Sequence, residues 1–345
     1  MTRPAQPVLA ATVIAWQRQH GRHGLPWQAT RNAYRVCLSE VMLQQTQVST
    51  VLAYYPRFLA RFPDVQTLAA APLDDVLALW SGLGYYSRAR NLHRCAQAVV
   101  AQHGGTFPTH SAALATLPGI GRSTAAAIAA FCFGERAAIL DGNVKRVLTR
   151  ALGFDGDLSS AAEEKRLWAL AENLLPARDV DVYTQGLMDL GATVCSRRKP
   201  ACERCPLAPR CVGHAAGAPE RLPVKTRRTR RGTRNNALLW LRRGAKLLLV
   251  QRPERGVWAG LWSLPEFDTP ADLQDLVRTW SGNGEWLPGF QHALTHFEWT
   301  LHPMRWTLPA RGKLPDGLPE GRWVSVDEAL LMGLPAPVRR LLGAC

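Results

Sequence analysis

The chain has 345 residues, 47% of them hydrophobic and 20% charged, which is typical of a soluble globular protein and excludes a disordered or membrane-embedded chain. This length exceeds the usual size of one compact domain, so we expect two. The formal net charge of +15 favours nucleic acid as a partner, because Lys and Arg side chains release condensed counterions from phosphates, although a basic surface kept for solubility is the alternative.

The first apolar stretch, Val8 to Trp16, is too short to span a bilayer and continues into polar residues without a cleavage site of small residues. It therefore predicts a first helix. No other segment approaches a membrane span, and clustered, reduced cysteines are typical of the cytosol. We expect no membrane partner, a monomer, and a cytoplasmic location in a bacterium, in association with the nucleoid.

Apolar residues recur at helical spacing from Thr12 to Leu190, with Pro and Gly in the short loops between them, which predicts a nearly all-helical region. Within it, Glu40 interrupts an apolar run from Val36 to Leu43. A buried acid without a function is costly, so Glu40 is a candidate catalytic residue. A glutamate at a helix end or on the surface is the alternative.

Residues 111–128 predict a helix, a tight hairpin and a second helix. The hairpin glycines, Gly119 and Gly121, would let backbone N–H groups approach a phosphate at the positive end of the second helix, and a plain helix–helix turn is the alternative.

Asp141 then precedes another predicted helix at an N-cap position. Backbone N–H groups would keep its carboxylate ionised at neutral pH.

Four cysteines follow in a C-x6-C-x2-C-x5-C loop over residues 195–211: Cys195, Cys202, Cys205 and Cys211. Four thiolates so close in sequence can surround a metal centre, and they suit either tetrahedral zinc or a 4Fe-4S cluster. The remaining cysteines, at positions 37, 95, 132 and 345, lie far apart and are typical of ordinary small apolar residues.

A basic, linker-like stretch from His214 to Arg234 predicts a domain boundary. After it, short apolar runs alternate with turn residues, which indicates an α+β domain over residues 235–345. The predicted elements are a hairpin of strands 237–241 and 246–250, a helix 271–280, and strands 297–303, 304–308 and 321–326.

The motifs LPGIGRSTAAAI and LDGNVKRVLTR, together with the cysteine loop, closely resemble the helix-hairpin-helix, Gly/Pro-rich loop and Asp superfamily of DNA glycosylases. The segments SEVMLQQTQV (39–48) and GLGYYSRARNL (82–92), and the added C-terminal domain, resemble MutY-type adenine DNA glycosylases rather than endonuclease III. The resemblance implies a helical glycosylase domain over residues 1–213, with the helix-hairpin-helix at 111–133 and an iron–sulfur loop at 195–211, then a basic linker at 214–234.

This resemblance implies base excision repair in which adenine opposite 8-oxoguanine or guanine is removed from duplex DNA. Glu40 would protonate adenine N7 as general acid, while Asp141 would stabilise or capture the oxocarbenium ion, as carboxylates do in glycosidases. Asn143 would orient the site. Bifunctional relatives have a lysine where this chain has Ser123, and a hydroxyl cannot form an imine, so we expect no efficient strand-cleaving lyase step.

The resemblance also assigns residues that hold DNA. Gln45 and Tyr85 match positions that intercalate when the target nucleotide is flipped out of the duplex. Leu25, Trp27 and Arg31 resemble residues lining the adenine pocket, although core packing is the alternative for Trp27. The cysteine loop would hold a 4Fe-4S cluster with a structural or DNA-sensing function.

Residues 247–267 resemble the entry to a Nudix hydrolase fold, but the acidic helix that holds Mg²⁺ in such enzymes is absent from the sequence. We therefore expect a Nudix-like module that recognises 8-oxoguanine without pyrophosphatase activity. Relatives read the lesion through a Phe-Ser-His-like segment, and the matching residues here are Leu294, Thr295 and His296. An ordinary strand with a hydrogen-bonded histidine is the alternative.

Three other functions stay open at this point. The first is an endonuclease III-like glycosylase for oxidised pyrimidines, which Ser123 and the C-terminal domain disfavour. The second is a non-catalytic iron–sulfur sensor that binds DNA, which the presence of both Glu40 and Asp141 disfavours. The third is a Nudix-type nucleotide hydrolase.

Overall fold

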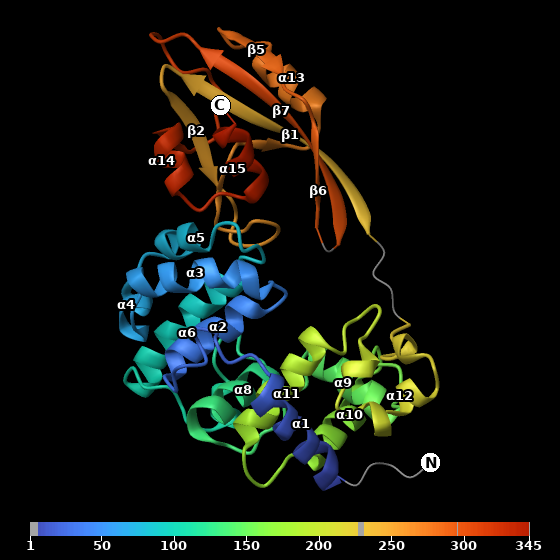
Figure 1. Cartoon of the computed structure of the whole chain (residues 1–345). Helices are drawn as coiled ribbons and strands as arrows, with labels where there is room; N and C mark the ends of the chain where they lie inside the picture. The colour runs from blue at the N-terminus through green and yellow to red at the C-terminus, as the bar shows by residue number, and fades with distance from the viewer. Residues whose placement is uncertain (1–5, 227–230, 295, 345) are drawn as a thin grey trace. The chain divides into compact units, whose positions relative to one another are not determined.

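The computed structural model describes residues 6–226, 231–294 and 296–344, and Figure 1 shows the arrangement of the elements. The chain divides into two compact units. The first contains the described residues of Met1–Ala69 and Arg94–Arg228, and the second contains those of Ala70–His93 and Thr229–Cys345. The predicted boundaries at residues 213 and 234 stay predictions.

The helical region is as extensive as the apolar spacing predicts. Its helices are α1 (Gln6–His20), α2 (Ala33–Leu43), α3 (Val48–Arg61), α4 (Val65–Ala70), α5 (Leu73–Trp80), α6 (Ser87–His103), α7 (Ser111–Leu114), α8 (Arg122–Phe133), α9 (Gly142–Leu152), α10 (Ala161–Asn173) and α11 (Val180–Thr193). A hydrophobic core joins buried residues of α1, α8, α9, α10 and α11. Burying these apolar faces is the main force that holds the first unit together.

The predicted helix, hairpin and helix correspond to α7, a turn and α8. Gly119 in this turn has a φ of +77°, a left-handed conformation that glycine adopts without a steric penalty. Gly121 is the N-cap of α8. Helix α8 is rich in buried alanines between Ala125 and Ala130, and their small side chains let neighbouring helices approach closely. The predicted phosphate-binding turn therefore stands at the N-terminus of a buried helix.

The cysteine loop follows α11 and has little regular structure. It contains the short 3-10 helices η1 (Cys202–Arg204) and η2 (Ala208–Arg210), and it leads into α12 (Val212–Ala215) and η3 (Pro219–Arg221). Short-range backbone hydrogen bonds hold its turns, such as those from the Cys205 N–H to the Cys202 carbonyl at 3.1 Å and from the Cys211 N–H to the Ala208 carbonyl at 3.2 Å. Side chains of α9 add hydrogen bonds to the start of the loop.

The second unit is built on a mixed sheet, which confirms the α+β prediction. Its strands are β1 (Gly232–Arg243), β2 (Lys246–Gln251), β3 (Trp262–Ser263), β4 (Glu266–Phe267), β5 (Asn283–Trp286), β6 (Phe290–Ala293), β7 (Phe297–Leu308) and β8 (Arg322–Ser325), and its C-terminal helices are α13 (Pro270–Val277), α14 (Val326–Leu331) and α15 (Ala336–Gly343). Strands β1 and β7 are parallel along their whole length, whereas the other pairs are antiparallel. The predicted β1–β2 hairpin is confirmed, with Arg243 opposite Lys246.

One sequence prediction in this unit is wrong, and the bounds of another differ from the structure. Strands predicted at 297–303 and 304–308 form the single strand β7, which continues through Pro303. Proline lacks an N–H donor, but the Pro303 carbonyl still accepts the N–H of Leu287 at 2.8 Å. The helix predicted at 271–280 is α13, which ends at Val277. Short elements such as β5, β6, α14 and α15 were not predicted.

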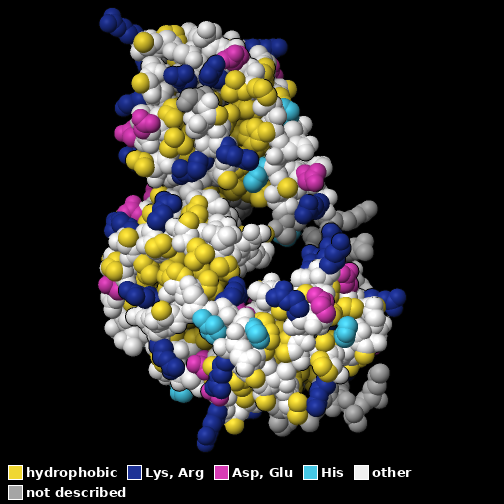
Figure 2. Space-filling model, in the orientation of Figure 1, with side chains coloured by type: hydrophobic (Ala, Val, Ile, Leu, Met, Phe, Trp, Pro, Cys, Tyr) yellow, Lys and Arg dark blue, Asp and Glu magenta, His cyan; other side chains and the backbone are white. Residues whose placement is uncertain are grey.

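Charged groups are spread over the surface. In Figure 2, Lys and Arg side chains are scattered over the face that is drawn, with Asp and Glu between them, rather than gathered in one patch. Within the described residues, no helix combines the length and the apolar character that a membrane crossing requires.

Candidate active site

A cavity of about 950 Å³ opens in the first unit. Several residues predicted for catalysis or DNA binding line it, although they are distant in sequence: Leu25, Trp27, Glu40, Gln45, Ser123, Asp141 and Asn143. Arg31 lines an adjoining cavity of about 430 Å³. Trp27 and Glu40 line both cavities, so the predicted adenine pocket residues lie around two neighbouring cavities that share part of their walls.

Glu40 lies in the last turn of α2, where its neighbours Ser39 and Val41 are fully buried. Its own side chain is half-buried. Burial raises the pKa of Glu40 to about 7, and the negative charge of Asp141 contributes to this rise. A carboxyl group with this pKa can donate a proton near neutral pH.

Asp141 is the N-cap of α9, as the sequence predicts. Its Oδ1 accepts the backbone N–H of Val144 at 2.7 Å. The pKa of Asp141 is raised overall, because burial outweighs the N–H groups of Val144 and Asn143 and the positive charges of Arg146 and Lys145, which lower it. The two carboxyl groups thus share a cavity, but only Asp141 has hydrogen bonds and cations that favour the ionised form.

Asn143 is held by a hydrogen bond and by close packing. Arg146 donates from Nη2 to Asn143 Oδ1 at 2.8 Å and from Nε to the carbonyl of Cys195 at 2.6 Å. A Cβ atom added at Gly191 would lie 2.5 Å from the Cβ of Asn143. The glycine therefore permits α11 to approach α9 at this position, and Arg146 joins the Asp141 loop to the start of the cysteine loop.

Ser123 lies in the first turn of α8, and its Oγ accepts the backbone N–H of Leu140 at 2.6 Å. This bond fixes the residue just before Asp141. The next residue, Thr124, accepts a hydrogen bond from Gln44 Nε2 at 3.3 Å. The helix after the hairpin thus contacts the segments that carry both candidate catalytic carboxyl groups.

The sequence reasoning missed a buried ion pair beside the cavity. Asp189 is fully buried and accepts the backbone N–H of Arg22 at 2.9 Å and its Nε at 2.7 Å. Gln185 donates to the same carboxylate at 2.8 Å, and both Arg22 and Gln185 line the cavity. No local sequence pattern could predict this ion pair, because Arg22 and Asp189 lie 167 residues apart in the sequence.

The two residues predicted to intercalate have unusual backbones. Gln45 and Tyr85 have φ values of 58° and 47°, in the left-handed region that residues other than Gly, Asn and Asp seldom adopt. Tyr85 belongs to the second unit and is 46% exposed. Strained backbones of this kind occur often at functional sites.

The four cysteines of the loop line one small cavity together with Arg150. Arg150 is fully buried, and its Nη1 donates to Cys195 Sγ at 3.4 Å and to the carbonyl of Ser196 at 2.7 Å. Burial raises the pKa of Cys205 to about 11. Among the described residues, no three His, Cys, Asp or Glu side chains are grouped tightly enough to hold a single metal ion.

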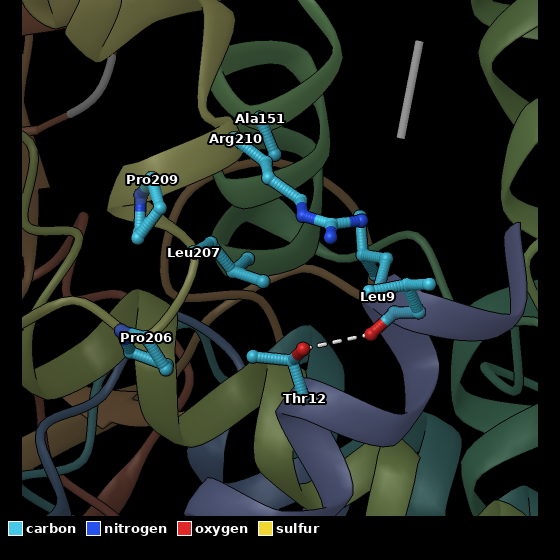
Figure 3. Close-up of a pocket in the computed structure, with 8 residues that line it drawn as sticks. Leu9, Thr12, Ala151, Pro206, Leu207, Pro209 and Arg210 are labelled. Atoms are coloured by element: carbon cyan, nitrogen blue, oxygen red, sulfur yellow. Dashed lines mark hydrogen bonds between the residues drawn. The ribbon is translucent and has the colours of Figure 1, made fainter. Parts of the chain in front are cut away.

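A separate cavity of about 250 Å³ lies between α1 and the cysteine loop (Figure 3). Thr12 donates its hydroxyl to the carbonyl of Val8 at 2.7 Å, and the Arg210 side chain extends toward Leu9. The lining is otherwise mostly apolar and includes no residue predicted for the site.

Two residues of the predicted lesion-reading segment, Leu294 and His296, lie in the β6–β7 turn, the stretch between β6 and β7. Thr295 falls outside the described residues. His296 is exposed, and its carbonyl accepts the N–H of Gly232 at 2.9 Å. The sequence reasoning missed the aromatic group beside this turn, in which Trp258 stacks on Trp299 with ring centroids 4.5 Å apart and contacts His292 at 5.6 Å.

Comparisons with known proteins agree with this architecture. Residues 38–173 match the HhH-GPD superfamily of base excision DNA repair proteins, and residues 236–344 match the NUDIX domain. The adenine DNA glycosylase of Buchnera aphidicola subsp. Acyrthosiphon pisum is 33% identical over 97% of this chain and 97% of its own length. The human adenine DNA glycosylase is 34% identical over 92% of this chain and 70% of its own length.

Among solved structures, a thermostable thymine-DNA glycosylase superposes with a TM-score of 0.55 and 29% identity, covering 61% of this chain and 97% of the other. This likeness supports the helical glycosylase fold of the N-terminal part. Together with the matches along nearly the whole sequence, it shows that the chain belongs to the adenine DNA glycosylase family, in which an HhH-GPD base excision repair domain precedes a NUDIX domain.

Proposed function

We propose that this protein is a monofunctional adenine DNA glycosylase that excises adenine opposite 8-oxoguanine or guanine in duplex DNA. The observation that carries the proposal is the cavity shared by Glu40 and Asp141, in which the two carboxyl groups have different surroundings. Pairs of carboxyl groups whose environments separate their pKa values divide the tasks of acid and anion in glycosidases.

In this mechanism Glu40 protonates N7 of the flipped adenine, since its pKa of about 7 leaves the proton available near neutral pH. The protonated base leaves with the electrons of the glycosidic bond, and positive charge develops on the deoxyribose. Asp141 stabilises that charge as an ion pair or captures the sugar carbon covalently. Water then completes the hydrolysis. Asn143, hydrogen-bonded to Arg146, orients this side of the site.

The DNA must be distorted for adenine to enter the cavity. Gln45 and Tyr85 fill the space that the flipped nucleotide leaves, while Leu25, Trp27 and Arg31 surround the base. The backbone N–H groups at Gly119 and Gly121 bind a phosphate at the N-terminus of α8. The family resemblance supports all of these assignments, and the lining of the two cavities supports those of Leu25, Trp27, Arg31 and Gln45 as well.

The reaction stops after base removal, because Ser123 provides no amine for a Schiff base. Its hydroxyl instead accepts the N–H of Leu140 at 2.6 Å. The product is an abasic site whose strand is cleaved only when alkali is added.

Cys195, Cys202, Cys205 and Cys211 hold a 4Fe-4S cluster in this proposal. The cysteines fit the group because all of them line one cavity and Arg150 donates a hydrogen bond to Cys195 Sγ, which a thiolate would accept strongly. Four thiolates suit tetrahedral zinc as well, so the choice of iron–sulfur rests on the family resemblance. Iron and sulfide analysis of the purified protein tests this assignment, and stoichiometric zinc would contradict it.

The C-terminal part recognises 8-oxoguanine through Thr295 and His296 and has no pyrophosphatase activity. In α13, Asp272 forms a capping box with Thr269, and Asp275 pairs with Arg278. The carboxylates of Asp272 and Asp275 are therefore engaged within the helix itself. Phosphate release from 8-oxo-dGTP in the presence of Mg²⁺ would contradict this part of the proposal.

The deciding experiment is a single-turnover assay on a duplex with one 8-oxoguanine:adenine pair, beside a guanine:adenine duplex. The expected result is cleavage of the adenine strand only after alkali treatment, with faster excision from the 8-oxoguanine duplex. Strand cleavage without alkali, or tight mispair binding without base release by protein with its full iron content, would contradict the proposal.

A further inference from the structure

Residues 70–93 belong to the same compact unit as the C-terminal part of the chain, and specific contacts hold this segment there. Asp74 accepts hydrogen bonds from Trp262 Nε1 at 3.1 Å and Gln251 Nε2 at 3.4 Å. At the other end of the segment, Arg90 donates to the carbonyl of Ala259 at 2.6 Å. The segment between Asp74 and Arg90, which includes Tyr85, is therefore fixed at both ends.

Close packing supplements these hydrogen bonds. Leu77 of α5 is fully buried, and a Cβ atom added at Gly333 would lie 3.0 Å from the Cβ of Leu77. The glycine thus lets the turn between α14 and α15 come close to α5. Leu334, the next residue in that turn, is also fully buried.

The carbonyl of Leu334 is the acceptor of two side-chain hydrogen bonds. Ser81 Oγ and Tyr86 OH each donate to it at 3.0 Å. These donors stand on either side of residues 82–85, so one backbone carbonyl ties together both ends of the loop that carries Tyr85. Arg339 supports the arrangement, because it donates to Ser81 Oγ at 3.0 Å and to the carbonyl of Met332 at 2.8 Å.

The loop itself requires such support. Gly82, Gly84 and Tyr85 have φ values of 104°, 71° and 47°, and the left-handed conformation is unfavourable for tyrosine. Such conformations persist only where the surroundings impose them. Arg88 donates to the carbonyls of Leu83 and Gly84, both at 3.1 Å, and the two bonds to Leu334 fix the loop from the C-terminal side.

We propose that Ser81, Tyr86 and the Leu334 carbonyl are positioning groups that hold Tyr85 in the conformation needed for insertion into DNA. The C-terminal part thereby supports base flipping directly, besides any contact that it makes with the lesion. This inference rests on the proposed function, in which Tyr85 intercalates. If the loop is already ordered before DNA binds, less of the binding free energy is lost in ordering it. Loosening the loop should therefore slow unstacking of the mispair and leave the later chemical step unchanged.

The test uses the full-length protein and the variants Tyr86→Phe and Ser81→Ala. Each removes one donor to Leu334 and keeps most of the side chain. Ser81→Thr retains a hydroxyl and is the rescue variant. Tyr34→Phe is the matched control, because Tyr34 OH likewise donates to a backbone carbonyl, that of Phe62, at 2.7 Å from a buried side chain. Thermal unfolding of every variant verifies that it folds.

Two measurements follow. Hydrogen–deuterium exchange of the peptide spanning residues 81–88 reports on the free protein. Fluorescence of 2-aminopurine beside an 8-oxoguanine:adenine pair reports on unstacking. Tyr86→Phe and Ser81→Ala should accelerate exchange and slow unstacking, each by about tenfold for one lost hydrogen bond. Ser81→Thr and Tyr34→Phe should resemble the wild type in both measurements.

If Tyr86→Phe and Ser81→Ala leave both measurements at the wild-type level, the inference is overturned. Faster exchange with normal unstacking would also overturn it, since the loop would then be loosened without effect on DNA. Failure of the proposed function is visible separately, because a wild-type protein that releases no adenine shows it without any variant. The exchange measurement on the free protein does not depend on that activity.

Discussion

The candidate functional side chains in the cavity of the first unit and in the β6–β7 turn of the second unit differ in their exposure to solvent. Glu40 and Asp141 lie in or at the ends of helices, among buried residues, and burial raises the pKa of both. His296 is exposed, and its backbone carbonyl accepts the N–H of Gly232. A general acid with a raised pKa must be shielded from water, whereas a residue that recognises a base must be accessible to DNA.

This difference sets the size and kind of effect that a substitution should have. Changes in the cavity should alter the rate of base release by large factors and leave mispair preference unchanged. Changes at the turn should alter the preference for 8-oxoguanine over guanine by small factors. Four predictions test this contrast.

The largest effect should come from Glu40→Gln. Glutamine has nearly the shape of glutamate, but its amide is not acidic enough to protonate the base, so the single-turnover rate should fall about 1,000-fold. Binding to the 8-oxoguanine:adenine duplex should remain close to wild type. The measurement is single-turnover excision with a parallel binding titration. Full activity of Glu40→Gln would show that Glu40 is not the general acid, and it would contradict the proposed difference between the two regions.

Asp141→Asn should follow, with a loss of about 100-fold in excision rate, because the anion that stabilises the sugar cation is gone. Asparagine caps a helix as well as aspartate does, so the Tm should stay near that of the wild type. Asp141→Ala separates the two roles, since it removes both the charge and the cap and should lower the Tm as well. A lower Tm in both variants, with Asp141→Asn excising adenine at the wild-type rate, would instead indicate a purely structural residue.

The pH dependence should show the raised pKa of Glu40. Excision should fall about tenfold per pH unit above pH 7, because the acid is then deprotonated. The folded chain also keeps a proton that the unfolded chain releases above its ordinary pKa of 4.5, so the free energy of unfolding should decrease as pH rises from 4.5 to 7. The residual activity of Glu40→Gln should lack this fall in rate, and urea titrations across the same pH range measure the stability change.

The sequence predicted much of the first region, because its signals are local. Helical spacing, the N-cap at Asp141 and an acid in an apolar run can each be read within a few turns of helix. The Arg22–Asp189 ion pair has no such signal, and only the packing of α11 near the N-terminal segment brings it together. The contact between Ser81 and Leu334 is equally non-local, so the support of the Tyr85 loop appeared only in the structure.

The second region was harder to predict, and for identifiable reasons. Pro303 interrupts the apolar alternation of β7 and made one strand resemble two. Strand β6 has only four residues, too few for a clear period. The stacked rings of Trp258 and Trp299 come from a loop and a strand far apart in sequence. Most tryptophans are buried in proteins for packing alone, so composition could not distinguish these two.

The smallest effect should come from the β6–β7 turn, where Leu294 stands in the place of an aromatic residue in the resembling segment. Leu294 is half-buried, and its N–H donates to the carbonyl of Phe297 at 2.9 Å, so a larger side chain there leaves the backbone bond in place. Leu294→Phe should increase the ratio of excision rates for 8-oxoguanine over guanine about threefold to tenfold, the usual gain from one aromatic stacking contact. Gln291→Phe, an exposed position on β6, is the control for added apolar surface.

The ratio of rates, rather than either rate alone, decides this last prediction. A Leu294→Phe protein that speeds both duplexes equally would show that the turn acts on DNA binding in general. A higher ratio with an unchanged rate on the guanine duplex would place lesion discrimination at the turn, because only the 8-oxoguanine duplex then gains from the added ring. Equal ratios in Leu294→Phe and Gln291→Phe would remove the turn from lesion recognition, and the stacked pair of Trp258 and Trp299 beside it would become the next surface to substitute.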